Sequence, residues 1–268
     1  MFHKRRIGIE SFSLSHTAGT LNITVTNGKN TRWILPNGTI VAGNTVNNTV
    51  STGKTILLCS NLADNSIQFN VLSNPTIVTF SLKDFRKRLT YYFRLYNCSN
   101  ITGSLADLVA KLTNTLILRS CSNITGSLAD LGGKITYYLD LGFCSNITGS
   151  LADLGAKITY YLDLGYCSNI TGSLADLGGK ITYYLSLSNC SLITGVYTPV
   201  GDGIPTYTYL DYTGLSTADM DSTLIAYAAT TKTNGVFRAY GKTRSSASDD
   251  AISTLVGRGW TINGLTKV

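Results

Sequence analysis

The chain has 268 residues and a formal net charge of +7 at neutral pH, and 43% of its residues are hydrophobic, which is enough for one or two domains with buried cores. Glutamate occurs once, at Glu10, and histidine occurs only at His3 and His16, so the usual general acids, general bases and metal ligands are scarce. This composition argues against most hydrolytic and metal-assisted chemistry, and we expect a protein that is not an enzyme and that uses no cofactor.

The positive charge belongs to the first third of the chain. Residues 1–94 contain eleven Lys and Arg against three Asp and Glu, whereas residues 95–190 contain five against six and residues 191–268 contain six against six. No apolar run approaches the ~20 residues of a membrane-spanning helix, and the basic opening segment lacks the apolar stretch of a secretory signal. We therefore expect synthesis in a cytoplasm, no membrane insertion, and, for any role outside a cell, exit by a route such as assembly into a virion.

Residues 1–62 alternate strand-like runs with Asn-Gly and other glycine-containing turns, which predicts a small all-β module. The segment from Trp33 through Gly53 to Leu57 resembles the PKD-like β-sandwich, in which a strand bearing Trp runs into a glycine turn. In this chain Asn37 stands where that family usually has Asp. The predicted strands are residues 21–26, 31–35, 39–42 and 54–59.

Five cysteines that recur every 23 residues give the strongest signal in the sequence. In each full copy the apolar positions follow L-x-L-x-x-C-x-x-I-x-G-x-L-x-x-L, which predicts a short strand with one buried face, a tight bend and a return segment. One copy cannot bury its own leucines, so the copies are expected to stack and to share one core. The copies are residues 89–111, 112–134, 135–157 and 158–180, a truncated copy at 181–195 and a diverged one at 66–88.

This pattern resembles the leucine-rich repeat family, close to its cysteine-bearing type, and the I-T-G-x-L segment is similar to plant-type repeats. The resemblance covers about residues 66–195 and implies a parallel sheet on the concave side of a curved solenoid, with Cys where the commonest form has Asn. We assign the repeats to residues 63–195. Their cysteines are expected to be free and buried, because an inward thiol packs as a small apolar group.

A loop at residues 196–206 holds two of the four prolines, and longer strand–helix units follow it. Residues 196–268 are therefore interpreted as a cap that shields the last leucines, with Ser216 or Thr217 capping its first helix. The predicted fold class is an α/β solenoid, with a parallel leucine-rich-repeat sheet between an N-terminal all-β module and a C-terminal strand–helix capping region. The strands of the cap are expected at residues 207–212, 235–240 and 260–262, and its helices at 216–230 and 247–256.

The positions that vary between copies form outward columns on the predicted concave sheet, whereas the inward and loop positions hardly change. A constant scaffold with a varied face indicates ligand binding, and tyrosine supplies a large, stiff ring with one hydroxyl group. The alternative is that the tyrosines only stack to stiffen the sheet, since cross-strand aromatic pairs contribute roughly 0.2–1 kcal/mol each; the two roles can coexist. The candidate ligand-binding residues are Tyr92, Arg94, Arg119, Tyr138, Asp140, Phe143, Tyr161, Asp163, Tyr166 and Tyr184.

Other polar patterns invite a chemical interpretation. Asp140 and Asp163 are expected near the ~5 Å separation of a retaining glycosidase pair, but neither has a Glu or His neighbour, so we predict no catalytic residue there. In the repeat copies an aspartate stands four residues before the last lysine, and the column of these aspartates could hold Ca²⁺. Neutralisation of that aspartate column by the lysines is the simpler interpretation, and no metal site is predicted. The basic segment 83–94 could meet phosphates or an acidic partner, or be a solvated face; no nucleic-acid partner is expected.

The expected function is recognition without catalysis. The β module, the nearly identical repeats and the scarcity of Glu and His resemble accessory structural proteins of bacteriophages that infect Bacteroidetes-like hosts. That resemblance implies a capsid or tail decoration located in the virion, whose N-terminal module contacts other virion proteins and whose concave face meets a protein or glycan ligand. The alternative is a bacterial interaction adaptor, in the cytoplasm or at the cell surface, that binds a protein partner. Homo-oligomerisation is left open.

Overall fold

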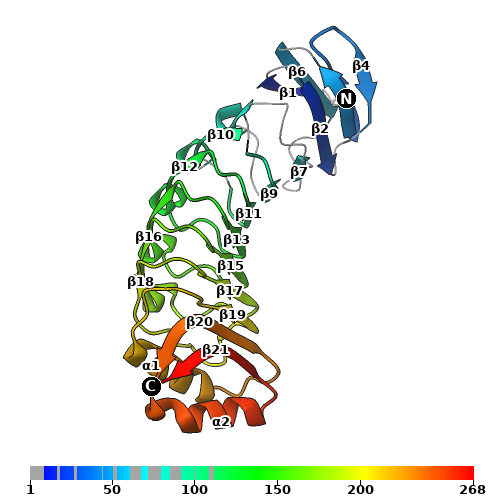
Figure 1. Ribbon diagram of the computed structural model, residues 1–268. Coiled ribbons are helices and arrows are strands. Elements are labelled where there is room, and N and C mark those ends of the chain that lie inside the picture. Colours follow the sequence, from blue (N-terminus) through cyan, green and yellow to red (C-terminus); the bar gives the residue numbers. More distant parts are fainter. Residues whose placement is uncertain are drawn as a thin grey trace.

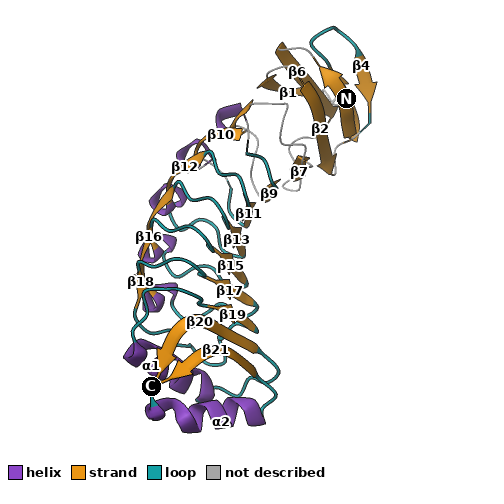
Figure 2. Ribbon diagram, in the orientation of Figure 1, coloured by secondary structure: helices purple, strands orange, loops and turns teal. Residues whose placement is uncertain are grey.

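The chain forms a curved stack of short turns, with a β module at its N-terminal end and two α-helices at its C-terminal end (Figure 1). In the described residues, an 11-stranded sheet in the order β21-β20-β19-β17-β15-β13-β11-β9-β7-β2-β5 follows the concave side, and six short strands in the order β18-β16-β14-β12-β10-β8 follow the convex side (Figure 2). The computed structural model describes residues 9–16, 19–26, 29–43, 45–50, 53–60, 68–71, 80–84, 92–99, 101–108 and 112–268.

The N-terminal module contains only strands within its described residues, as predicted. Its elements are β1 (Ile9–His16), β2 (Gly19–Thr26), β3 (Lys29–Ile34), β4 (Ile40–Ala42), β5 (Thr45–Val50) and β6 (Gly53–Ser60). The predicted strands correspond to β2, β3, β4 and β6, whereas β1 and β5 were not predicted. Strands β1, β6, β3 and β4 form one antiparallel sheet, and Trp33 is fully buried with its Nε1 donating to the Gly43 carbonyl at 3.0 Å.

Strand β7 (Gln68–Val71) joins the module to the repeats. It pairs antiparallel with β2 and parallel with β9 (Tyr92–Leu95), so one sheet continues from the module into the solenoid. The backbone hydrogen bonds of β2 and β7 therefore close the edge that the first repeat would otherwise expose.

The repeats share one construction, as the 23-residue period predicts. A short strand on the concave sheet is followed by a short strand on the convex side and then by a 3-10 helix. Parallel register joins residues 23 apart on the concave side, as in Leu139 opposite Leu162. The concave strands are β9, β11 (Thr115–Ile117), β13 (Tyr138–Asp140), β15 (Tyr161–Asp163), β17 (Tyr184–Ser186) and β19 (Tyr207–Tyr209). The convex strands are β8 (Phe80–Ser81), β10 (Ile101–Ser104), β12 (Ile124–Ser127), β14 (Ile147–Ser150), β16 (Ile170–Ser173) and β18 (Ile193–Thr194).

The 3-10 helices are held by reciprocal caps. The Ala129 N–H donates to Ser127 Oγ at 3.2 Å, and the Ser127 N–H donates to Asp130 Oδ2 at 2.8 Å. The same pair recurs in the next two copies, so the aspartate column has a capping role that the Asp–Lys spacing did not predict. The five helices are η1 (Leu82–Asp84), η2 (Leu105–Leu108), η3 (Leu128–Leu131), η4 (Leu151–Leu154) and η5 (Leu174–Leu177).

A single core of leucine, isoleucine and cysteine runs through the stack. The five repeat cysteines are buried and none of them is in a disulfide, as predicted. The Cys144 thiol donates to the Leu118 carbonyl of the preceding copy at 3.0 Å, and Cys167 bonds Leu141 at 3.1 Å in the same way. The thiols therefore fill the core and also tie each copy to its neighbour.

The C-terminal cap agrees with its prediction to within a few residues at most ends. It begins with β19 and continues with α1 (Thr217–Ala228), β20 (Val236–Arg244), η6 (Ser246–Ser248), α2 (Asp249–Gly257) and β21 (Thr261–Lys267). Ser216 caps α1, because its Oγ accepts the Asp219 N–H at 3.1 Å while the Asp219 carboxylate accepts the Ser216 N–H at 3.0 Å. Strands β20 and β21 extend the concave sheet in parallel register. In the described part of the chain, no helix has the length and apolar character needed to cross a bilayer.

Candidate functional site: the concave face

Three tyrosines that the repeat register predicted to face outward stack along the concave sheet. Tyr138, Tyr161 and Tyr184 are partners across β13, β15 and β17. Their ring centroids lie 3.9 and 4.4 Å apart, with the planes within a few degrees of parallel. We call these three residues the inner ladder. Each ring is half-buried, so both the stacking role and the binding role considered from the sequence remain compatible with the geometry.

A second row of rings, which the strand alternation did not predict, lies beside the first. Tyr137, Tyr160 and Tyr183 stack with centroid separations of 4.6 and 4.8 Å, and we call them the outer ladder. Tyr137 and Tyr183 are 42% and 39% exposed. These residues precede the short strands, so a period of two does not place them on a face. The signal that could have found them is the Tyr-Tyr pair that occurs in four copies, at 91–92, 137–138, 160–161 and 183–184.

Two carboxylates expected on the accessible face are buried instead. Asp140 and Asp163 are 4% and 2% exposed. Arg119 forms an ion pair with Asp163, and its Nη1 lies 3.5 Å from Asp140 Oδ1. The Gly142 and Gly165 N–H groups donate to the same two carboxylates at 3.1 and 2.8 Å. Asp140 and Asp163 therefore support the face from within and do not present charge to a ligand.

Glycine at the end of the concave strand leaves room for the Arg119 side chain to reach both carboxylates. A Cβ at Gly142 would lie 2.8 Å from Arg119 Nη1, so a larger residue there would push the guanidinium away from the carboxylates. The column reads Arg119, Gly142, Gly165 in consecutive copies. One copy thus supplies the cation, and the next two supply the space and the anions.

Burial controls the protonation of this cluster. It raises the pKa of Asp140 to about 7, and the Asp163 carboxylate acts in the same direction, against the Gly142 N–H and Arg119. Burial lowers the pKa of Arg119, but the charges of Asp163 and Asp140 outweigh this effect and raise it. Burial also raises the pKa of Tyr138 and of Tyr184 to about 12, so these rings are neutral phenols at physiological pH.

An exposed aromatic pair occupies a strained backbone position. Phe143 and Tyr166 have φ of +63° and +64°, are 42% and 49% exposed, and stack with centroids 4.4 Å apart. Bulky residues rarely adopt this left-handed conformation, whereas Asn, which stands at the equivalent positions 97 and 189, tolerates it. Residues held in such sparsely populated conformations cluster at functional sites. This pair is therefore the strongest contact candidate among the predicted residues.

The C-terminal end of the face carries a second charge pair that was not predicted. Asp211 is buried and lies 2.7 Å from Arg238 Nη2, and the Arg238 Cζ lies 4.3 Å from the centre of the Tyr209 ring. Tyr209 in turn packs against Tyr184 with a centroid separation of 5.3 Å. Because the cap had been assigned only a shielding role, its side chains were not weighed as part of the face.

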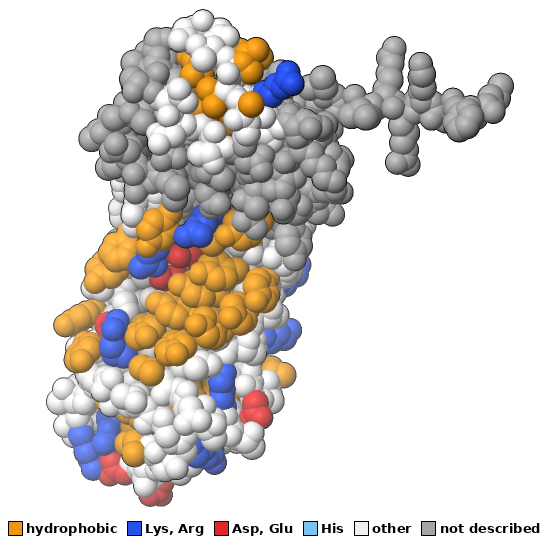
Figure 3. All heavy atoms as spheres, turned by 90° about the vertical axis from the view of Figure 1, so that its right-hand side faces the viewer, with side chains coloured by type: hydrophobic (Ala, Val, Ile, Leu, Met, Phe, Trp, Pro, Cys, Tyr) orange, Lys and Arg blue, Asp and Glu red, His pale blue; other side chains and the backbone are white. Residues whose placement is uncertain are grey.

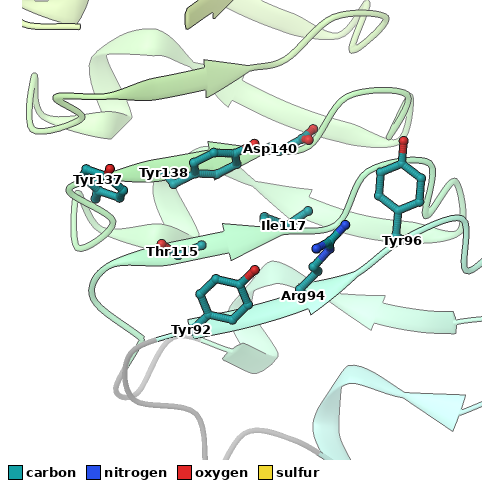
Figure 4. A pocket seen from close by; sticks show the side chains of 8 residues that line it. All are labelled: Tyr92, Arg94, Tyr96, Thr115, Ile117, Tyr137, Tyr138 and Asp140. Atoms are coloured by element: carbon teal, nitrogen blue, oxygen red, sulfur yellow. The ribbon is translucent and has the colours of Figure 1, made fainter. Parts of the chain in front are cut away.

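The N-terminal end of the face is hollowed. A depression of about 300 Å³ lies over β9, β11 and β13 (Figure 4). The predicted residues Tyr92, Arg94, Tyr138 and Asp140 line it, together with Tyr96, Thr115, Ile117 and Tyr137. The basic segment 83–94 is described only at residues 83–84 and 92–94, so its predicted role is outside what the structure describes.

Hydrophobic side chains, tyrosine included, form a continuous patch over the middle of the concave side, with Lys and Arg at its margins (Figure 3). Within the described ranges, no three His, Cys, Asp or Glu side chains are grouped so that they could hold a metal ion. Comparison with protein-family models, curated proteins and solved structures yields no match for this chain.

Proposed function

We propose that the concave face is a non-catalytic recognition surface for a protein or a glycan. The observation that carries this proposal is the distribution of differences between copies. Apart from Ile in place of Leu112, copies 135–157 and 158–180 have the same core residues as copy 112–134, and they differ from it mainly at positions on the concave strands and at the ends of those strands. Large neutral rings at these positions offer contact area at low entropic cost.

The burial of the two aspartates supports binding without catalysis. A carboxylate pair that hydrolyses a glycoside must reach the scissile bond from both sides. Asp140 and Asp163 are instead covered and held by Arg119 and by backbone N–H groups. A role in organising the rings above them accounts for both residues.

For the setting, we propose an accessory protein of a phage virion, with the N-terminal module attached to other virion proteins and the repeats directed toward the host. The continuous sheet through β2, β7 and β9 favours this arrangement, because a ligand-binding face joined to its anchor by backbone hydrogen bonds keeps a defined orientation on a particle. The PKD-like and leucine-rich-repeat resemblances belong to this proposal. A bacterial interaction adaptor with a protein partner is the alternative.

Mass spectrometry of purified particles from the source organism tests the setting, since a virion protein must be found in them at a stoichiometric level. Its absence from particles would favour the adaptor.

The binding role is tested by adding fluorescently labelled protein to cells of the host and comparing the double variant Phe143→Asn/Tyr166→Asn with Val200→Asn. Val200 is 63% exposed in the loop after β18 and provides a matched apolar-to-Asn control. Loss of cell binding only in the double variant is the expected result; equal binding by all three proteins would contradict it.

A further inference from the structure

The rows of stacked tyrosines have different neighbours at their C-terminal and N-terminal ends. At the C-terminal end the rings of Tyr207 and Tyr209 cover them, with Tyr207 edge-on to Tyr183 at 5.5 Å and Tyr209 tilted against Tyr184 at 5.3 Å. At the other end the next strand, β11, carries Thr115 opposite Tyr138. No ring among the described residues covers this side of Tyr138. One end of the inner ladder is therefore closed by side chains, and the other is open.

The spacing at the open end matches one missing ring. Thr115 is the register partner of both Tyr92 and Tyr138, so these two tyrosines lie two strands apart, at ~9.5 Å. Consecutive rings of the inner ladder are 3.9 and 4.4 Å apart. A ring placed above Thr115 would continue the ladder at its own spacing. The hollow of about 300 Å³ occupies this place (Figure 4), and we call it the ladder gap.

The walls of the ladder gap define what would fit it. Thr115 and the apolar Ile117 are 4% and 8% exposed and form its floor. At its margin Arg94 is exposed, its guanidinium forms no ion pair with a described residue, and its Cζ lies 5.8 Å from the centre of the Tyr96 ring. Asp140, the acidic lining residue, is already held by Arg119 and the Gly142 N–H. The charge offered to a ligand is thus the positive charge of Arg94.

We propose that the ladder gap binds a flat aromatic ring that carries an acidic group. The ring stacks on the open face of Tyr138 above Thr115 and Ile117, and the acidic group contacts the Arg94 guanidinium. This inference rests on the proposed recognition role of the concave face and assigns a ligand chemistry to one part of it. The chemistry is shared by a free aromatic acid and by an aromatic residue in an acidic peptide.

The test is isothermal titration calorimetry of the full chain with indole-3-acetate, with the uncharged indole-3-ethanol, with D-glucuronate and with the capped peptide aspartyl-tryptophyl-aspartate. We expect indole-3-acetate to bind more tightly than indole-3-ethanol, and glucuronate to bind least. The Thr115→Tyr variant places in the gap the residue that neighbouring copies carry there, so it should fold and should weaken indole-3-acetate by about tenfold or more. Thr261→Tyr adds the same ring at an exposed position of β21 and should change nothing.

A second variant separates the two halves of the proposal. Arg94→Gln should weaken indole-3-acetate by about threefold to fivefold, the size of an exposed ion pair, and should leave indole-3-ethanol unaffected. The peptide arm distinguishes the source of the ring: tighter binding of the peptide than of the free acid indicates a protein ligand, and the reverse indicates a small molecule.

The proposal is overturned if no aromatic probe binds the wild-type chain at millimolar concentration, if Thr115→Tyr binds indole-3-acetate as well as Thr261→Tyr does, or if glucuronate binds best. These outcomes are independent of the broader recognition role. If the Phe143→Asn/Tyr166→Asn variant loses host-cell binding while the aromatic acids fail to bind, the concave face remains a recognition surface, but the ladder gap is not one of its binding sites.

Discussion

Copy 112–134 and copy 135–157 have the same backbone course and different surfaces. Both bury their Leu, Ile and Cys residues in the shared core, and both place a positive-φ residue at the end of the concave strand, Ser120 in one and Phe143 in the other. On the concave side the first copy offers Thr115, Ile117 and Arg119 where the second has Tyr138, Asp140 and Gly142. The core residues thus hold the same backbone course in two copies whose face residues differ.

The same comparison shows that the two copies depend on each other through the face. Arg119 belongs to copy 112–134, but both of its carboxylate partners, Asp140 and Asp163, belong to the two following copies. A face position can therefore be varied freely only where its neighbours in the stack carry no buried charge.

The largest effect is expected when the shared cation is removed. Arg119→Met leaves Asp140 and Asp163 buried beside each other with backbone donors alone, and breaking a buried ion pair in this way typically costs about 3–5 kcal/mol. Urea denaturation at pH 8 measures the free energy of unfolding. Adding Asp140→Asn and Asp163→Asn to the same chain should restore most of the loss, because no buried charge then lacks a partner. A loss below about 1 kcal/mol in the single variant would show that the bridge is not structural.

The next effect concerns pH. The folded-state pKa of Asp140 is about 7, above its ordinary value of 3.8, so its protonated form stabilises the fold. That contribution is fully present below pH 3.8 and is lost as the pH rises through 7.

Between these limits the free energy of unfolding should fall by up to about 1.4 kcal/mol per pH unit, on the order of 2–4 kcal/mol in all. Urea denaturation from pH 4.5 to 8 tests this, with Asp140→Asn as the variant that should flatten the curve. Asp211→Asn, which changes the pair at the C-terminal end, is the control that should keep the slope. A wild-type curve that rises over this range would contradict the assigned burial effect.

A smaller effect is expected at the strained aromatic pair. Asn adopts the left-handed conformation at lower cost than Phe or Tyr, but the change also removes the stacking of Phe143 on Tyr166. The two effects oppose each other, so Phe143→Asn/Tyr166→Asn should change the free energy of unfolding by no more than about 1 kcal/mol. The thermal midpoint of the double variant measures it. A loss of several kcal/mol would assign the two rings to the scaffold.

These cases show which parts of the structure could be predicted from the sequence. Many apolar positions together define the 23-residue period. The period therefore predicted the stack, the buried thiols and the register of Tyr138, Tyr161 and Tyr184. The burial of Asp140 and Asp163 did not, because it depends on Arg119 from another copy lying across Gly142. Tyr137 was missed because it lies outside the strand, where alternation carries no information. Contacts between unlike residues of different copies are thus what the repeat pattern leaves undetermined.

The smallest expected effect makes the two compared copies alike. Thr115→Tyr gives copy 112–134 the inner-ladder residue of its neighbours, and the new ring can stack on Tyr138 at the spacing of the existing pairs. Because Thr115 is almost fully covered in the native chain, the new ring must project above the sheet and into the hollow that Thr115 lines. A gain of about 0.2–1 kcal/mol in the free energy of unfolding follows from one added cross-strand aromatic pair.

Differential scanning calorimetry should resolve this gain as a small rise in the thermal midpoint, whereas Thr261→Tyr, with no stacked neighbour, should show none. A loss of stability would mean that Thr115 and its hydrogen bond to the Asn114 side chain, at 2.8 Å, stabilise the native end of the inner ladder. In that event the difference between the copies would reflect packing at β11. If stability rises, the native chain keeps Thr115 at the expense of stability, as expected where a site must stay open for a ligand.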